Sequence, residues 1–213
     1  MKKTIIWDFD GVIINSNEIR EIGFRNSLNG YHEDNIDSLI KFHRANGGLS
    51  RYVKFKYFFE NITKEEYSSK QIEDLAFTFS NIMKENLIKP KYLINSSVDF
   101  IKNYHNNFNF HIASGSDEKE LNYLCTNLNI DSYFKSINGS PKNKPDIINE
   151  IIKLNKYNKD ECLLIGDSIN DYEAAEICNI NFFSFNKDKK LSEIKTDEIV
   201  DWDLFVKSII KNE

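Results

Sequence analysis

The stretch Asp8-Phe9-Asp10-Gly11-Val12-Ile13 decides the fold, and it directly follows the apolar run Ile5-Ile6-Trp7. The short run and its β-branched residues predict a buried strand at residues 3–8. Gly11 then allows the backbone to turn away sharply. Two carboxylates at the end of a buried strand are costly unless a cation lies between them. Because ligands of open α/β sheets bind at the carboxyl ends of strands, this pair predicts a site for chemistry. The simpler alternative is an acidic turn that caps the next helix.

Later segments of the chain alternate between apolar runs and helical patterns. The runs predict strands near residues 108–113, 161–166 and 180–185. The helical patterns lie near residues 117–128, 144–155 and 168–178. This alternation is typical of βαβ units, so we expect an α/β fold with a Rossmann-like parallel sheet and helices on both faces.

Between the first two predicted strands, the apolar spacing is helical throughout. One stripe consists of Ile72, Leu75, Ala76, Phe79, Ile82 and Met83. We expect a four-helix cap, with helices near residues 16–28, 36–45, 50–61 and 70–86. Pro90 cannot continue a helix, so it indicates the return linker. The predicted domains are an α/β core at residues 1–14 and 91–213 and an inserted helical cap at 15–90.

The composition limits the classes of function. Of the 213 residues, 40% are hydrophobic and 29% are charged, which is typical of a soluble protein. The net charge of −5 argues against general nucleic-acid binding. No segment is long and apolar enough to cross a membrane. The three cysteines, Cys125, Cys162 and Cys178, cannot all pair and lack metal-ligand spacing, so we expect reduced thiols in a cytoplasmic protein.

Three more segments complete a pattern of motifs. The second predicted strand ends in Ser114-Gly115-Ser116, lysines lie within Gly139–Asp146, and the next strand leads into Gly166-Asp167 with Asp171 one helical turn later. An Asp-x-Asp-Gly, a strand-end Ser, a Lys and a Gly-Asp-x-x-x-Asp, in this order, closely resemble the haloacid dehalogenase-like (HAD) hydrolase superfamily. Within it, the inserted helices resemble the cap of phosphatases similar to beta-phosphoglucomutase and phosphoglycolate phosphatase. The resemblance covers essentially the whole chain.

The resemblance implies Mg²⁺-dependent hydrolysis of a small phosphorylated metabolite through an aspartyl-phosphate. It makes Asp8 the nucleophile and a metal ligand. Asp10 would protonate the leaving oxygen and then deprotonate the attacking water, and its backbone carbonyl would also bind the metal. Asp167 would be the second carboxylate on the ion, with Asp171 acting through water or through contacts with the groups that hold the ion.

The same resemblance assigns phosphate binding to Ser114, the backbone N–H of Gly115, and Lys144. Ser114 could instead cap the helix that starts near residue 117. The site lysine could also be Lys142, but Lys144 directly precedes Pro145, which suits the first turn of a helix.

A glycine pair, Gly47-Gly48, separates two of the predicted cap helices and is flanked by basic side chains. We expect an exposed loop from which His43 and Arg51 contact an anionic or polyhydroxylated substrate, with Lys54 a weaker candidate. An ordinary helix connection with solvated charges is the alternative.

Other functions share parts of this pattern. A phosphosugar mutase similar to beta-phosphoglucomutase also uses an aspartyl-phosphate and a helical cap. A dehalogenase has no need of Asp10 as a proton donor. A non-catalytic phosphoacceptor module would be shorter, and its acceptor would not follow the first strand. The identity of the substrate and the oligomeric state are left open by the sequence.

Overall fold

The structure is a computed structural model that describes residues 3–210. Its centre is a parallel sheet with the strand order β3-β2-β1-β4-β5-β6. The strands are β1 (Thr4–Trp7), β2 (Asn109–Asp117), β3 (Ser136–Ser140), β4 (Cys162–Gly166), β5 (Asn181–Ser184) and β6 (Asp197–Glu198). Trp7 at the end of β1 is in register with Ile112 of β2 and Ile165 of β4. The first predicted strand therefore lies in the middle of the sheet.

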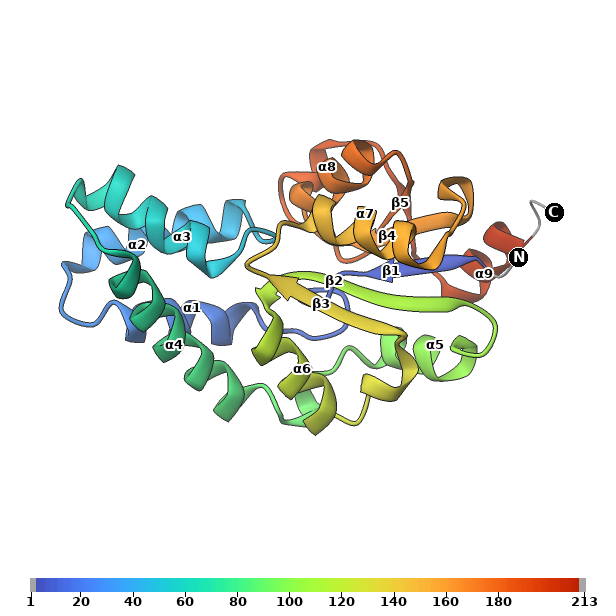
Figure 1. The fold of residues 1–213 in the computed structure, drawn as a ribbon, viewed down its shortest axis with the longest axis horizontal. Coiled ribbons are helices and arrows are strands. Elements are labelled where there is room, and N and C mark those ends of the chain that lie inside the picture. Colours follow the sequence, from blue (N-terminus) through green and yellow to red (C-terminus); the bar gives the residue numbers. More distant parts are fainter. Residues whose placement is uncertain (1–2, 211–213) are drawn as a thin grey trace.

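Helices cover both faces of this sheet, as predicted. On one face are α5 (Asn95–Tyr104), α6 (Glu118–Asn127) and α9 (Trp202–Ile210), and on the other are α7 (Lys144–Asn155) and α8 (Ile169–Cys178) (Figure 1). Side chains of β1 alternate between these faces, since Ile5 and Trp7 join one apolar cluster and Ile6 joins the other. The α/β, Rossmann-like fold class is confirmed.

Four helices between β1 and β2 form the inserted cap. They are α1 (Asn17–Ser27), α2 (Glu33–Ala45), α3 (Arg51–Tyr57) and α4 (Ser69–Asn86). The third continues as a π-helical turn at Phe58–Thr63. The cap lies beyond the carboxyl ends of the strands (Figure 1). Its interior is aromatic, with Phe24, Phe55, Phe58, Phe59 and Phe79 all buried. The exact division at residues 14/15 and 90/91 stays a prediction.

The two chain segments that join the cap to the core run side by side. Ile14 and Leu93 form an antiparallel bridge. The N–H of Asn15 donates to the carbonyl of Tyr92 at 2.8 Å, and the N–H of Ile94 donates to the carbonyl of Ile13 at 2.9 Å. A 3-10 turn at Pro90–Tyr92 precedes this pairing. The cap is therefore tied to the core by a short two-stranded ribbon.

Both tryptophans of the chain lie in one aromatic cluster against the sheet. Trp7 stacks on Trp202 of α9 with ring centres 5.7 Å apart, and Phe100 and Phe110 contact Trp7 as well. This cluster packs α5 and α9 onto β1, one residue before Asp8. It therefore anchors the strand from which the candidate nucleophile extends.

Two further observations concern the described residues as a whole. Within residues 3–210, no helix combines the length and the apolar character needed to cross a membrane. The three cysteines are buried and free.

Candidate active site

The acidic and basic residues predicted from the motifs meet at the carboxyl edge of the sheet. Asp8 follows β1, Asp167 follows β4, and Asp171 lies in the first turn of α8. Lys144, the first residue of α7, places its Nζ 2.8 Å from Asp8 Oδ1 and also contacts Asp171 Oδ1. Side chains from three different strand–helix junctions thus converge because parallel strands end at the same edge.

Three carboxylates form a compact cluster in which one oxygen of each lies within 4.8 Å of the others: Asp8, Asp167 and Asp171. Asp171 Oδ2 accepts hydrogen bonds from the N–H groups of Asp167 at 3.2 Å and Ser168 at 3.1 Å, and from Ser168 Oγ at 2.7 Å. Gly11 has φ +76°, and a Cβ there would lie 2.0 Å from Asp167 Oδ2. Only glycine therefore leaves room for this cluster.

The electrostatics of the cluster favour a bound cation. Burial, and then the charge of Asp171, raise the pKa of Asp8 to about 7 even though Lys144 opposes the shift. Burial, and then the charges of Asp171 and Asp8, raise the pKa of Asp167 well above its usual range. Clustered carboxylate oxygens are the ligands that hard divalent ions prefer. These residues therefore fit the metal that the sequence resemblance implies.

The two lysines beside α7 have different environments. Lys144 is buried against Asp8, whereas Lys142 is exposed and pairs with Glu150. Asn143 caps the helix by accepting from the N–H of Asp146 at 2.9 Å, and Pro145 lies in the first turn. Of the two candidates, Lys144 is the one that reaches the site.

Ser114 is not a helix cap. That role belongs to Asp117, whose Oδ1 accepts from the N–H groups of Lys119 and Glu120, both at 3.1 Å. Ser114 is buried, accepts from the N–H of Ser116 at 3.1 Å, and lines the pocket together with Gly115. The alternative explanation for Ser114 is therefore wrong, and its hydroxyl faces the site.

Asp10 is held by groups that the sequence analysis missed. Its Oδ1 accepts from Arg20 Nε at 2.6 Å and from Ser16 Oγ, and its Oδ2 accepts from Ser116 Oγ at 2.7 Å. Burial opposes ionisation, but Arg20 and the hydroxyl donors outweigh it, so the pKa of Asp10 is lowered. A signal for Arg20 was present, because it interrupts the buried stripe of α1 beside Ile19.

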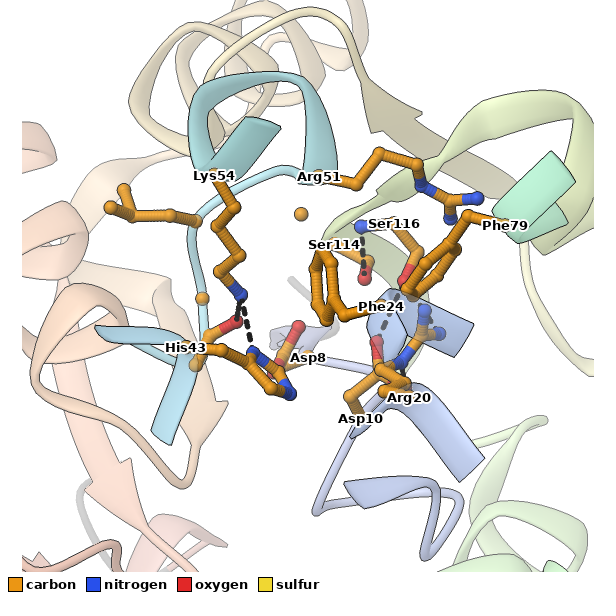
Figure 2. Close-up of a pocket in the computed structure, with 14 residues that line it drawn as sticks. Asp8, Asp10, Arg20, Phe24, His43, Arg51, Lys54, Phe79, Ser114 and Ser116 are labelled. Atoms are coloured by element: carbon orange, nitrogen blue, oxygen red, sulfur yellow. Dashed lines mark hydrogen bonds and ion pairs between the residues drawn. The ribbon is translucent and has the colours of Figure 1, made fainter. Parts of the chain in front are cut away.

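Besides Arg20, the cap contributes three basic side chains that line the pocket: His43, Arg51 and Lys54 (Figure 2). Lys54 Nζ lies 2.9 Å from His43 Nδ1 and 3.0 Å from the carbonyl of Gly47. Burial, followed by the charge of Arg20, lowers the pKa of Lys54 to about 7. Burial and Lys54 hold the pKa of His43 well below its usual range. A neutral His43 can therefore accept a hydrogen bond from Lys54.

The prediction of an exposed cap loop is wrong for these residues. Arg51 and Lys54 are each only 3% exposed. The reason is that α3 begins at Arg51, whose guanidinium lies over the Phe79 ring at 4.5 Å and donates to Ser80 Oγ at 2.6 Å and to Glu120 of α6. Tertiary contacts with α4 and α6 therefore bury a segment that the sequence presents as a charged connection.

The cap is seated directly on the core. A Cβ on Gly115 would lie 2.3 Å from the carbonyl oxygen of Gly48, so the two backbones touch at this point. The pocket around Asp8 and Asp10 measures about 20 Å³, which is room for about one water molecule, and a second pocket of about 220 Å³ lies between Gly48 and Val53 of the cap and Lys144 of the core. The structure therefore represents a closed arrangement.

Comparisons with known proteins agree with this architecture. The family model described as "Haloacid dehalogenase-like hydrolase" matches residues 5–185. No curated protein matches the chain.

Several solved structures share the fold. A beta-phosphoglucomutase from Clostridium difficile is 18% identical, with a TM-score of 0.79 and coverage of 99% of this chain and 98% of its own. A predicted phosphoglycolate phosphatase from Haemophilus somnus is 17% identical, with a TM-score of 0.75 and 97% coverage of both chains. A HAD-hydrolase from Bacillus subtilis, bound to magnesium, is 18% identical, with a TM-score of 0.70 and 98% coverage of both. Since the family match spans most of the sequence, the chain belongs to the haloacid dehalogenase-like hydrolases.

Proposed function

We propose that this protein hydrolyses a small phosphomonoester through an aspartyl-phosphate on Asp8, with Mg²⁺ as cofactor. The observation that carries the proposal is the convergence of Lys144, Asp8 and the other acids at one point of the sheet edge. A lone acidic turn would not require a buried lysine beside it. Membership of a hydrolase family supports the reaction class.

Two half-reactions follow from the positions of Asp8 and Asp10. In the first, an Asp8 oxygen attacks phosphorus, the bond from phosphorus to the leaving oxygen breaks, and a proton on Asp10 passes to that oxygen. In the second, water attacks the phosphorus, Asp10 accepts its proton, and Asp8 is released with free phosphate. The donors around Asp10 favour its carboxylate, which is the form needed for this second step.

The remaining residues on the core side of the site would balance the charge of the reacting groups. Mg²⁺ held by Asp8, Asp167 and the backbone carbonyl of Asp10, with Asp171 behind them, would relieve the repulsion between the nucleophile and an anionic phosphate. Lys144 would neutralise charge on the transferring group, and Ser114 and the N–H of Gly115 would bind its oxygens.

The cap side would bind the part of the substrate that does not react. Arg51 Nε and Nη2 are buried and find no hydrogen-bond partner among the described residues, although the side chain lines the pocket. With His43 and Lys54 nearby, these free donors suit an anionic or hydroxyl-rich group. In the closed arrangement the pocket around Asp8 has room for about one water molecule, so we propose that the cap moves away from the core when a phosphomonoester binds. We therefore treat residues 15–90 as one mobile domain.

A screen of phosphorylated metabolites with detection of released phosphate tests the proposal. We expect release from at least one small phosphomonoester, and from p-nitrophenyl phosphate at a lower rate. Release that requires a sugar bisphosphate activator would point to a phosphosugar mutase instead. No release from any ester, with Mg²⁺ present and the protein folded, would overturn the proposed function.

A further inference from the structure

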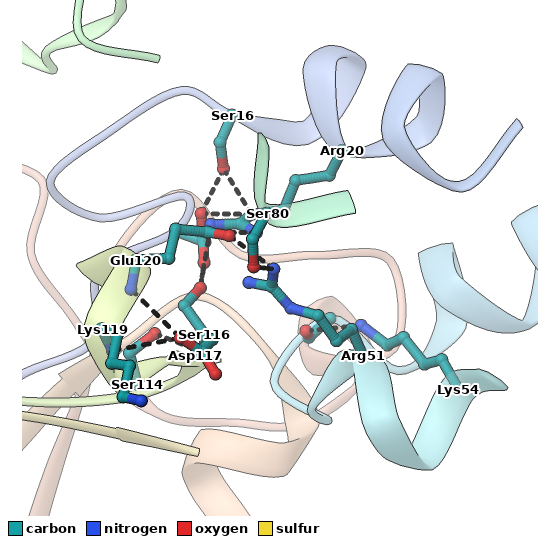
Figure 3. A network of polar contacts seen from close by, with 12 residues as sticks. Ser16, Arg20, Arg51, Lys54, Ser80, Ser114, Ser116, Asp117, Lys119 and Glu120 are labelled. Atoms are coloured by element: carbon teal, nitrogen blue, oxygen red, sulfur yellow. Dashed lines mark hydrogen bonds and ion pairs between the residues drawn. The ribbon is translucent and has the colours of Figure 1, made fainter. Parts of the chain in front are cut away.

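Glu120 is a fully enclosed charged residue at the junction of cap and core. It lies in the first turn of α6 and has no exposed surface. Its Oε1 lies 3.4 Å from Arg20 Nη1, and its Oε2 accepts from Arg51 Nη1 (Figure 3). Both arginines come from the cap, whereas Glu120 belongs to the core. One carboxylate thus bridges two cap helices.

Arg20 extends this bridge to the reacting groups. Its Nε donates to Asp10 at 2.6 Å, and its Nη2 donates to Ser116 Oγ at 2.8 Å. The same Ser116 hydroxyl donates to the second oxygen of Asp10. A single guanidinium therefore reaches both sides of the Asp10 carboxylate and Glu120 at once. Because a guanidinium is planar and rigid, a shift at Glu120 changes the orientation that Arg20 gives to Asp10.

The anchor on the core side is itself fixed. Asp117 accepts from the N–H of Glu120 at 3.1 Å, and its other oxygen accepts from the Tyr52 hydroxyl at 2.8 Å. Neighbouring residues of α3 thus hold both ends of the first turn of α6, since Tyr52 contacts the N-cap Asp117 and Arg51 contacts Glu120. The contacts pass from Arg51 of the cap to Glu120 of the core, and then through Arg20 of the cap to Asp10.

We propose that Glu120 is a positioning residue that orients the acid/base Asp10 through Arg20 when the cap is seated. The proposal rests on the proposed function, since it assigns Asp10 the proton transfer. The four groups carry balanced charge, with two arginines and two carboxylates, so none is left uncompensated when the cap is closed. Glu120 touches no reacting atom, and its effect passes through Arg20.

The dependence on the leaving group separates positioning from a purely structural role. Phenyl phosphate needs proton donation from Asp10 more than p-nitrophenyl phosphate does, because phenolate is the more basic leaving group. We expect Glu120→Gln to lower kcat/KM for phenyl phosphate at least about tenfold more than for p-nitrophenyl phosphate. If the effect passes through Arg20, the double variant Glu120→Gln/Arg20→Met should show the same ratio of kcat/KM for the two esters as Arg20→Met alone.

Two controls sharpen the experiment. Glu21→Gln removes an ion pair with Arg44, in which Nε and Oε1 are 2.6 Å apart, on the exposed surface of the cap. It should leave the ratio unchanged. Glu120→Asp keeps the charge but shortens its reach, so it should shift the ratio in the same direction even if the glutamine variant does not fold. Unfolding temperatures identify the folded variants.

The outcomes distinguish this proposal from the proposed function. If the wild-type protein cleaves neither these two esters nor any ester of the metabolite screen, the proposed function fails and the inference fails with it. If the wild type is active but a folded Glu120 variant loses the same factor on both esters, or loses nothing, the positioning role is overturned while the phosphatase proposal stands.

Discussion

The core side and the cap side of the candidate site are built in different ways. On the core side, Asp8, Lys144 and Asp171 each lie within a few residues of a strand end, so the local backbone places them. On the cap side, Arg51 and Lys54 come from a helix whose position depends on contacts with α4, α6 and the end of β2 at Gly115. The difference implies that core substitutions remove chemistry, whereas cap substitutions alter selection and the seating of the cap.

The largest effect should come from Asp8, the proposed nucleophile. Asp8→Asn keeps the shape of the side chain but removes the attacking carboxylate, so we expect kcat to fall by more than about 10⁴-fold on every ester. No phosphoenzyme should be trapped by acid quenching from labelled substrate. Retention of a rate near wild type would show that the acidic cluster is structural.

Removal of the metal should be almost as severe. EDTA should abolish release of phosphate from p-nitrophenyl phosphate, and excess Mg²⁺ should restore it, because Asp8 cannot approach a phosphate dianion unshielded. The matched experiment adds Mg²⁺ and EDTA in equal amounts. Full activity in chelator would contradict the role assigned to the acidic cluster.

Asp10→Asn should have an intermediate effect. The nucleophile remains, but the acid/base is lost, which costs about 10²–10⁴-fold. A phosphoenzyme should still form from p-nitrophenyl phosphate and should decay slowly, and a rapid acid quench can follow both phases. If this variant and Asp8→Asn behaved alike, the division of labour between the two residues would be wrong.

A cap substitution should separate two kinds of substrate. Arg51→Ala should lower kcat/KM for the best metabolite in the screen by about tenfold to hundredfold, since a hydrogen bond to a charged group contributes about 1.5–3 kcal/mol. The loss on p-nitrophenyl phosphate should be smaller.

Stability should fall as well, contrary to what an exposed arginine would imply. Removing Arg51 leaves the buried Glu120 with Arg20 alone, and breaking a buried pair costs about 3–5 kcal/mol. Urea unfolding can measure this. Arg44→Ala, on the exposed face of the cap, is the control and should change little. In the kinetic experiment, equal losses of kcat/KM on the metabolite and on p-nitrophenyl phosphate would place Arg51 at the phosphate rather than at the rest of the substrate.

The smallest expected effect is a pH dependence of the cap. Lys54 has a pKa of about 7, so its charge is present below pH 7 and is lost as the pH rises through this value. The ratio of kcat/KM for an anionic metabolite to that for p-nitrophenyl phosphate should therefore fall severalfold above about pH 7. Taking the ratio cancels titrations of the core side. Lys54→Arg stays charged and should flatten the curve, and an unchanged slope would exclude Lys54 from substrate binding.

The sequence predicted the core better than the rest of the fold because strand-end motifs carry their own geometry. Asp8 and Asp167 directly follow β1 and β4, Ser114 lies near the carboxyl end of β2, and Lys144 begins the helix after β3. The short and partly polar segments Ser136–Ser140 and Asp197–Glu198 carry too little alternation to be recognised as strands. The helices α5 and α9 were not predicted either, although both are strongly amphipathic.

The cap side could be predicted only as a set of candidates. Arg20, Arg51 and Glu120 are charged residues whose burial depends on one another, and they lie far apart in the sequence. Spacing within a helix shows which face a residue shares but not which opposite charge will cover it. These ion pairs form only when the cap is in place, so the roles of the three residues can be inferred only from the tertiary structure.

The pairing of Trp7 with Trp202 has a practical consequence for optical measurements. Since both indoles lie against the sheet, tryptophan emission reports on the core and is largely silent about the helical insertion. Far-ultraviolet dichroism, in contrast, is dominated by helices of both regions. If the insertion melts first on heating, the dichroism signal should change at a lower temperature than the emission, which would reveal two unfolding units without any added label.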